Sequence, residues 1–414
     1  MKIVEGVNLH LLKNEKFKTN HITFRFSGEF DRKTVARRVL VAQILATANA
    51  TYPTAQKFRE KLSDLYGASL STNVSTKGLV HIVDVDIVFV KDRFVMTGEK
   101  ILEEVIDFLK EILFSPLISI AQYQAKLFDL EQKNLISYLK SDKEDHFYSS
   151  QLELKNLFYD NSTLQISRYG QEELVLAENS YTVYQEFQKM LKQDYLDIFI
   201  LGEFNDYRML QLLNQFPLES RQKTLNFNYN QPYSNITKEK IEKKDIRQSV
   251  LQLGYHLPVT YSNDDYFSLL LFNAVFGAFT HSKLFTELRE KEGLAYLIGS
   301  QFDIFTGLLN VYAGIDRENR NKVLHLVNKQ LHYIKIGRFS SDLINQSKII
   351  LKTNRLLLVD YAKSEIEYEY NKNHLEKSYD TITWIDKIDT VSKEDIKKVA
   401  TTIKLQALYF LEGD

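Results

Sequence analysis

The spacing of hydrophobic positions divides the first half of the chain into alternating strands and helices. Residues 83–89 alternate apolar with mostly polar positions, which is the two-residue period of a strand with one wetter face. Within Thr34–Asn49, apolar residues recur every three to four positions, which is the spacing of a helix. Gly67 can end a second, shorter helix that Thr54 can cap. The predicted elements are strands at Asn20–Gly28, 83–89 and Leu196–Gly202, and helices at Thr34–Asn49, 58–65, 101–113 and 123–140.

The pattern stops at Pro217–Arg247 and then restarts. This segment is rich in Asn, Gln, Lys and Tyr and has no sustained apolar period, so we interpret it as a connector between domains. The elements predicted after it are strands at Ser249–His256, Ala295–Phe302, Leu308–Gly314 and the C-terminus, and helices at Asp265–Phe276, Ser282–Glu290 and from Arg317 and Ser340.

Two pairs of segments indicate that the second half repeats the first. LYFLEGD at the C-terminus resembles IFILGEF at Ile198–Phe204, and ELREKEGLAYL resembles KLSDLYGASLS with Gly293 and Gly67 226 residues apart. We therefore predict two homologous α+β domains, each a mixed, mostly antiparallel sheet packed with helices. The predicted boundaries are 1–215 and 248–414 for the domains and 216–247 for the connector. The alternative is that any two α+β domains show a loosely similar order of elements.

Composition and charge narrow the classes of function. The 53 Lys and Arg residues nearly balance 54 Asp and Glu, so a nucleic-acid or anionic-membrane protein is disfavoured. The absence of cysteine excludes disulfides, thiolate metal sites and cysteine nucleophiles. Because Met1–Leu12 does not resemble a secretion signal and no stretch is apolar enough to span a bilayer, we expect a cytoplasmic protein.

The common catalytic motifs are missing. No two histidines have the spacing of a zinc hydrolase, since the nearest two, His325 and His332, are seven residues apart. Phosphate-binding glycine loops and the Gly-x-Ser-x-Gly elbow are also absent. His281 and Ser282 are adjacent but lack an identified orienting acid, which makes them a very weak signal of a catalytic triad; the alternative is loop packing or capping of a helix by Ser282. We predict no metal site in this chain.

One segment, Phe276–Ser300, combines residues that could act together. Arg289 near a helix end and Tyr296 at a strand start, seven residues later, could face one cleft. A guanidinium and a phenol placed together can donate hydrogen bonds to a carbonyl oxygen as it gains negative charge. The alternative is that Arg289 forms a salt bridge with a neighbouring glutamate, at 287, 290 or 292, and that Tyr296 is buried in the sheet.

The sequence SKLFTELREKEGLAY within this segment resembles the C-terminal signature of the pitrilysin/insulinase family, which includes the mitochondrial processing peptidases. The likeness extends over essentially the whole chain. It implies two related α+β domains in a clamshell, and two subunits that close around an unfolded peptide. It also implies that Arg289 and Tyr296 act on the substrate carbonyl, and we predict that Phe279 and Ser282 bind substrate beside them.

In its first half, the chain departs from the zinc-binding motif of this family. The family places zinc on an inverted His-x-x-Glu-His motif, and aligning the Tyr52-Pro53-Thr54 turn puts Val39, Ala42 and Gln43 at the first His, the Glu and the second His. Valine and alanine have no lone pair, and a lone glutamine amide is a poor ligand and no general base. The family's later Glu falls near Ser137–Tyr138, with Glu131 close by.

The resemblance therefore implies a zinc-free subunit without a cofactor of its own, which lends Arg289 and Tyr296 to a zinc-bearing homologous partner. The expected partners are that subunit and a peptide substrate, with no nucleic acid or membrane, and the isolated chain could form homodimers. A second hypothesis is a structural or peptide-binding member without peptidase activity. The bacterial members of the family that this chain resembles most are associated with the modification of elongation factor P, so the resemblance also implies a link to that process. A third hypothesis, a self-sufficient hydrolase, has almost no support from the scattered histidines.

Overall fold

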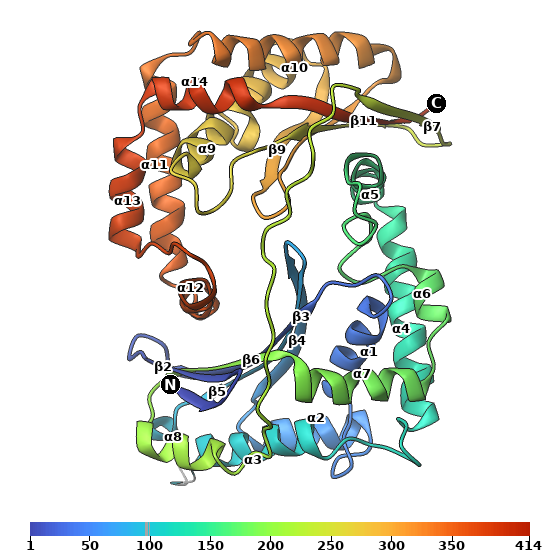
Figure 1. The fold of residues 1–414 in the computed structure, drawn as a ribbon, viewed down its shortest axis with the longest axis vertical. Coiled ribbons are helices and arrows are strands. Elements are labelled where there is room, and N and C mark those ends of the chain that lie inside the picture. Colours follow the sequence, from blue (N-terminus) through green and yellow to red (C-terminus); the bar gives the residue numbers. More distant parts are fainter. Residues whose placement is uncertain (96–97, 99) are drawn as a thin grey trace. The chain divides into compact units, whose positions relative to one another are not determined.

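A computed structural model describes residues 1–95, 98 and 100–414 and divides into two compact units. The first comprises residues 1–141 and 167–226, and the second comprises residues 142–166 and 227–414. Each unit contains one mixed sheet packed with helices (Figure 1), so the predicted α+β class is confirmed. This division differs from the expected boundaries, because residues 142–166 belong to the second unit and the expected connector contributes to both units.

The first sheet, as far as the described residues show, contains six strands in the order β1-β2-β6-β3-β5-β4. Strand β2 runs parallel to β6, and the pairs β6–β3, β3–β5 and β5–β4 are antiparallel. The strand bounds are Lys2–Val4 (β1), Val7–Lys13 (β2), Thr19–Glu29 (β3), Ser69–Lys77 (β4), Val80–Val90 (β5) and Tyr195–Gly202 (β6).

The second sheet repeats this plan in the order β7-β11-β8-β10-β9. Here β7 runs parallel to β11, and the pairs β11–β8, β8–β10 and β10–β9 are antiparallel. Strands β7 to β11 thus correspond one to one with β2 to β6, which supports the predicted duplication. The bounds are Lys238–Lys243 (β7), Ser249–His256 (β8), Ala295–Asp303 (β9), Leu308–Ile315 (β10) and Lys404–Glu412 (β11).

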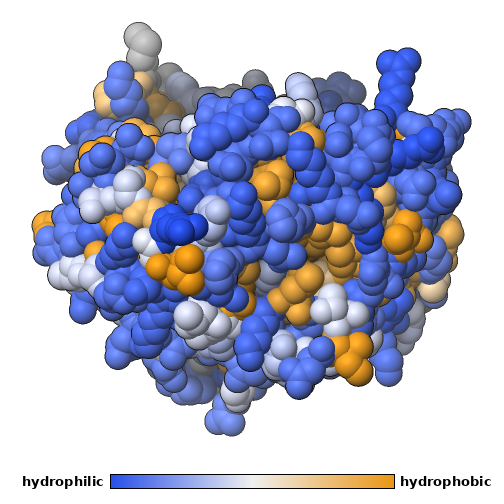
Figure 2. Space-filling model, turned by 90° about the horizontal axis from the view of Figure 1, so that it is seen from above, coloured by the Kyte–Doolittle hydropathy of each residue, from blue (hydrophilic) through white to orange (hydrophobic). Residues whose placement is uncertain are grey.

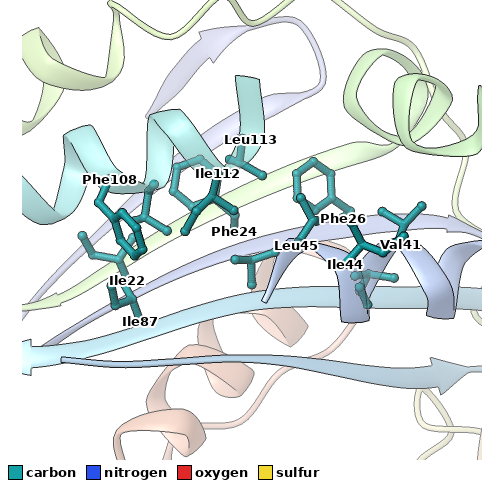
Figure 3. Packing of buried hydrophobic residues seen from close by; sticks show 14 of the residues in the cluster. Ile22, Phe24, Phe26, Val41, Ile44, Leu45, Ile87, Phe108, Ile112 and Leu113 are labelled. Atoms are coloured by element: carbon teal, nitrogen blue, oxygen red, sulfur yellow. The ribbon is translucent and has the colours of Figure 1, made fainter. Parts of the chain in front are cut away.

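Helices cover the apolar face of the first sheet. Alternate residues of β3 point to this face, where they meet side chains of α1 and α3 (Figure 3). The predicted cap of α2 is confirmed, because the Thr54 side chain accepts a hydrogen bond from the backbone N–H of Lys57. The helical bounds are Val35–Leu45 (α1), Ala55–Asp64 (α2), Asp92–Phe94 (η1, 3₁₀), Ile101–Phe114 (α3), Ala125–Glu144 (α4), Glu172–Leu176 (α6), Ser180–Gln193 (α7) and Asp206–Leu213 (α8).

Helix α5 (His146–Phe158) explains why residues 142–166 join the second unit. It packs on β8 and β11, on the sheet face opposite the main core of that unit. The approach is close, because a Cβ atom on Gly254 would lie 3.1 Å from the Phe158 ring and one on Gly314 would lie 2.9 Å from the Phe147 ring. Glycines at these two positions therefore make room for the helix.

Most of the remaining helices of the second unit contribute to the core on the apolar face of its sheet, but α12 and η4 do not (Figure 1). Leu251 and Leu253 of β8 and Val311 of β10 point to this face, and the helices bury them. The helical bounds are Tyr266–Asn273 (α9), Ala274–Ala278 (η2, π), Phe285–Lys291 (η3, π), Arg317–Asn319 (η4, 3₁₀), Arg320–Lys335 (α10), Ser341–Leu358 (α11), Ala362–His374 (α12), Thr381–Thr390 (α13) and Lys393–Thr402 (α14).

The molecular face drawn in Figure 2 is largely hydrophilic, and its hydrophobic residues lie in small groups between hydrophilic ones. Within residues 1–95, 98 and 100–414, the helices are all too short or too polar to cross a bilayer.

Candidate functional site

The structure brings Arg289 and Tyr296 side by side. Arg289 lies near the end of η3, and Tyr296 is the second residue of β9. The turn between them contains Gly293 at φ 61°, and the backbone N–H of Leu294 donates a 2.8 Å hydrogen bond to the Leu288 carbonyl. The Cζ atom of Arg289 lies 5.7 Å from the centroid of the Tyr296 ring, within the range of a cation–π contact.

The neighbouring glutamates do not form salt bridges with the Arg289 guanidinium. Glu287 pairs with Lys291 at 3.2 Å, and Glu292 pairs with Lys322 at 2.8 Å. Arg289 forms no ion pair with any residue that the structure describes. The salt-bridge alternative is therefore wrong, and the donors of this exposed guanidinium are available to a ligand.

Tyr296 faces solvent rather than the core. The residue is 77% exposed, so the alternative of a tyrosine buried in the sheet is also wrong. A phenol and a guanidinium that lie next to each other on the surface can donate hydrogen bonds to the same oxygen. The pair is thus suited to bind a carbonyl group or an anion presented from outside this chain.

The ring of Phe285 also lies against the guanidinium, and this residue was not identified from the sequence. Its ring centroid lies 4.9 Å from Arg289 Cζ, four residues along the same helical segment. The available signal was the i, i+4 spacing of an aromatic residue and a cation. The segment is π-helical, as is Ala274–Ala278 before it, and such turns are rare and frequent at functional sites.

Phe279 and Ser282 are placed differently from the exposed pair. The Phe279 ring stacks on His281 with centroids 5.6 Å apart, and His281 Nε2 lies 2.9 Å from Ser347 Oγ on α11. Ser282 is fully buried, and its Oγ accepts a 3.4 Å hydrogen bond from the backbone N–H of Phe285. The capping alternative therefore describes Ser282, since direct contact with substrate would require an exposed side chain. The substrate role of Phe279 stays a prediction.

The positions of the zinc motif on α1 do not fit a zinc ion. Val39 and Ala42 are 2% exposed and belong to the apolar core. Gln43 is half-buried, and its Oε1 atom has no hydrogen-bond partner among the described residues. A single amide oxygen does not replace two imidazoles. Across the described part of the chain, no three His, Asp or Glu side chains are grouped as a metal site would require.

Glu131 lies near the C-terminal end of α1 but bonds to other groups. Its carboxylate accepts hydrogen bonds from Thr47 Oγ1 at 2.8 Å and Asn134 Nδ2 at 3.2 Å. Tyr138, near the expected position of the later Glu, stacks edge-on against Tyr169 with centroids 5.1 Å apart. The Glu131 carboxylate is thus part of a local polar contact between α4 and the turn that follows α1.

A buried polar network lies beside these positions. Arg38, which precedes Val39, donates from Nε to His81 Nδ1 at 2.9 Å and from Nη1 to Asp194 Oδ2 at 2.6 Å. Burial, reinforced by the Arg38 charge, lowers the pKa of His81 to about 3. His81 is therefore neutral, and since Nδ1 accepts from Arg38, Nε2 donates to the Arg168 carbonyl. The network joins α1 and β5 to the segments that carry Arg168 and Asp194.

Comparisons with known proteins place the chain among peptidase-like proteins. Residues 181–351 match the family model described as "Peptidase M16 inactive domain". The chain is 28% identical over 410 residues to "Probable inactive metalloprotease YmfF" of Bacillus subtilis strain 168, covering 99% of this chain and 96% of that protein. It is 23% identical over 254 residues to "Uncharacterized zinc protease YmxG" of the same strain, covering 60% of each. A crystal structure of a conserved protein from Enterococcus faecalis V583 superposes with a TM-score of 0.97 at 36% identity, over 100% of this chain and 98% of that one.

Proposed function

Because this chain belongs to the peptidase M16 family, we propose that it is the zinc-free subunit of a heterodimeric peptidase. In this proposal a homologous partner binds the zinc, and Arg289 and Tyr296 act in trans on the peptide. The observation that carries the proposal is the exposed Arg289–Tyr296 pair, whose guanidinium has no carboxylate partner among the described residues. The positions at Val39, Ala42 and Gln43 support the division of labour, because they offer no ligands for the metal.

The two side chains have separate roles in this mechanism. The Arg289 guanidinium would bind the substrate carbonyl oxygen, and the Tyr296 hydroxyl would donate a second hydrogen bond to it. Both interactions strengthen as the oxygen gains negative charge, so they stabilise the transition state more than the bound peptide. The partner's zinc would supply the activated water.

The expected partner is a like-sized homologue with an intact His-x-x-Glu-His sequence. One Bacillus subtilis strain contains relatives named as an inactive metalloprotease and as a zinc protease, which supports a pairing of this kind. The alternative function is a peptide-binding family member without a catalytic partner. In that case Arg289 and Tyr296 would bind peptide but no mixture of subunits would cleave it.

Reconstitution tests the proposal. The chain mixed with its zinc-bearing homologue should form a heterodimer in size-exclusion chromatography with light scattering and should digest an unstructured peptide, whereas this chain alone should not. Arg289→Ala and Tyr296→Phe should each lower kcat by about 10²-fold without preventing association, the loss typical of a transition-state donor. Arg317→Ala, an exposed arginine of the same unit, is the matched control. Unchanged turnover in both variants would refute the catalytic role.

A further inference from the structure

Positive charge accumulates along helix α10 without any acid in the same stretch of sequence. Residues 319–341, which include this helix, contain five Lys or Arg and no Asp or Glu. Three of these cations bond to glutamates or to a backbone carbonyl elsewhere in the fold, namely Arg320, Lys322 and Lys335. Lys329 and Arg338 form no ion pair with any residue that the structure describes. These two side chains therefore carry charge that the described chain does not neutralise.

A third cation, Lys283, meets them around the ring of Tyr333. The Nζ atoms of Lys283 and Lys329 lie 5.6 and 5.7 Å from the ring centroid, and Arg338 Cζ lies 5.2 Å from it. Because all three lie this close to one point, any two of them are at most about 11 Å apart. Lys283, Lys329 and Arg338 thus form one cation cluster on the second unit.

The acids near Lys283 do not neutralise the cation cluster. Glu287 pairs with Lys291 at 3.2 Å, and the exposed Glu290 forms no ion pair among the described residues. Lys283 is half-buried, and this burial lowers the pKa of its ammonium, an effect that Glu287 opposes and Lys291 reinforces. A tyrosine ring attracts cations but has no net charge, so it does not replace a counter-ion. An anion from outside the chain would relieve the cost of holding this charge away from water.

The helix dipole of α10 does not explain the cation cluster. Cations near a helix C-terminus are favourable, but the effect is confined to about the last turn. Lys335, at the end of α10, fits this description. Lys329 lies six residues earlier, and Lys283 belongs to a different segment, two residues before η3. Their position around Tyr333 therefore needs another reason.

We propose that the cation cluster binds an acidic peptide segment through its Asp and Glu side chains. In an extended peptide, alternate side chains point to the same side and are about 7 Å apart, which matches cations separated by no more than about 11 Å. The net charge of the chain is −1, so it attracts acidic peptides only where cations gather locally. The site is separate from the Arg289–Tyr296 pair and does not depend on a zinc-bearing partner.

Spaced carboxylates suit this site better than a phosphate group does. A phosphate concentrates its charge on a few oxygens, and proteins usually bind it with arginine forks or with the backbone N–H groups at a helix N-terminus. The cation cluster has a single arginine, and it lies along the C-terminal half of α10, where the backbone presents carbonyl groups. Separate ammonium groups can instead each bind one carboxylate of a peptide.

Variants of equal charge test the proposal. A fluorescent peptide of about eight residues in which Glu alternates with Ser should bind this chain in fluorescence anisotropy at low salt, and its Gln–Ser counterpart should bind at least about 10-fold more weakly. Lys283→Met should raise the Kd of the Glu peptide by at least about 3-fold. Lys387→Met, which removes the same charge from an exposed lysine of α13, should leave it unchanged. Equal binding of the two peptides, or equal effects of the two variants, would overturn the proposal.

The same variant tests whether Lys283 lacks a counter-ion in the folded chain. Methionine keeps an apolar stem against Tyr333 and removes the half-buried charge, so the melting temperature of Lys283→Met should equal or exceed that of the natural chain. A clearly lower melting temperature would contradict the argument. Competition tests the class of anion, because tripolyphosphate that displaced the peptide at far lower concentration than unlabelled Glu peptide would show a preference for phosphate.

Zero-length cross-linking locates the peptide on the unmodified chain. A carbodiimide joins a peptide carboxylate to a lysine amine only where the two groups are in contact. Mass spectrometry should therefore find the Glu peptide attached to Lys283 and Lys329 well ahead of exposed lysines such as Lys387. Cross-links spread evenly over the exposed lysines would contradict binding at the cation cluster. These experiments use this chain alone, so a failure of the heterodimer proposal would not alter their outcome.

Discussion

Gly67 and Gly293 occupy the same place in the two repeated units. Each precedes an end strand of its sheet, β4 or β9, and adopts a left-handed backbone conformation, with φ of 71° and 61°. At both positions an added Cβ atom would have no heavy atom within 4 Å. The backbone conformation, and not lack of space, therefore requires glycine at these turns.

Replacing the two glycines should have the same effect on stability but different effects on peptide turnover. Gly67→Ala and Gly293→Ala should each lower the free energy of unfolding by about 1 kcal/mol, because alanine disfavours positive φ. Only Gly293→Ala should also lower peptide turnover by the reconstituted heterodimer, since this turn connects Arg289 to Tyr296. Urea unfolding and steady-state kinetics measure the two effects. Equal losses of turnover in both variants would contradict a local effect on the pair.

Phe285 should position the Arg289 guanidinium through its ring. Phe285→Leu keeps an apolar side chain but removes the aromatic face, and exposed cation–π contacts contribute about 0.5–1 kcal/mol. We therefore expect kcat of the heterodimer to fall by roughly 2- to 5-fold with little change in KM. Phe285→Tyr, which retains the aromatic face, should restore the rate. If the tyrosine variant were as slow as the leucine variant, packing rather than the cation–π contact would explain the loss.

Periodicity predicted most of the strands that carry core residues, but it missed β2, whose Val7 and Leu9 belong to the core. Strands β3, β5 and β8 are confirmed, because alternation or β-rich composition marks a strand packed against helices. Strand β7 lies within the expected connector, since KEKIEK is exposed at a sheet end and needs no apolar alternation. Helix α5 was not among the predicted elements, and an apolar helix face would not by itself identify the sheet that buries it.

The candidate site was also predicted only in part, because residue spacing does not show how side chains pack in the folded chain. The resemblance to the pitrilysin/insulinase family is confirmed, and the seven-residue spacing of Arg289 and Tyr296 does bring the two side chains together. Whether Tyr296 is exposed and whether Arg289 is paired with a glutamate depend on tertiary packing, which spacing does not encode. The burial of Ser282 likewise follows from the turn before η3 and not from its position in the motif.

The purified chain should contain no stoichiometric zinc. Val39 and Ala42 offer no lone pairs, and Glu131 is engaged by Thr47 and Asn134. Inductively coupled plasma mass spectrometry of protein expressed with excess zinc should find far less than one zinc per chain, and EDTA should leave the melting temperature unchanged. Near-unit zinc that disappears in Gln43→Ala would show that α1 retains a metal site.

His81 should make the stability of the first unit depend on pH. Its pKa is lowered to about 3 in the folded chain from an ordinary value near 6.5, chiefly by burial. Between these values the unfolded chain binds a proton that the folded chain does not. The contribution of His81 to stability is therefore fully present above pH 6.5 and is lost as the pH falls toward 3, by up to about 1.4 kcal/mol per pH unit.

Comparison with His81→Asn isolates this contribution. The asparagine oxygen can replace Nδ1 as acceptor for Arg38 Nε but does not titrate. The variant should be less stable at pH 7.5, because the bond to the Arg168 carbonyl is lost, yet its free energy of unfolding should fall less between pH 6.5 and pH 5 than that of the natural chain. The other titrating groups act alike in both proteins, so the difference between the two pH slopes reports on His81 alone. Parallel slopes in urea unfolding would mean that the histidine is protonated in the folded state, in conflict with its buried contact to the Arg38 guanidinium.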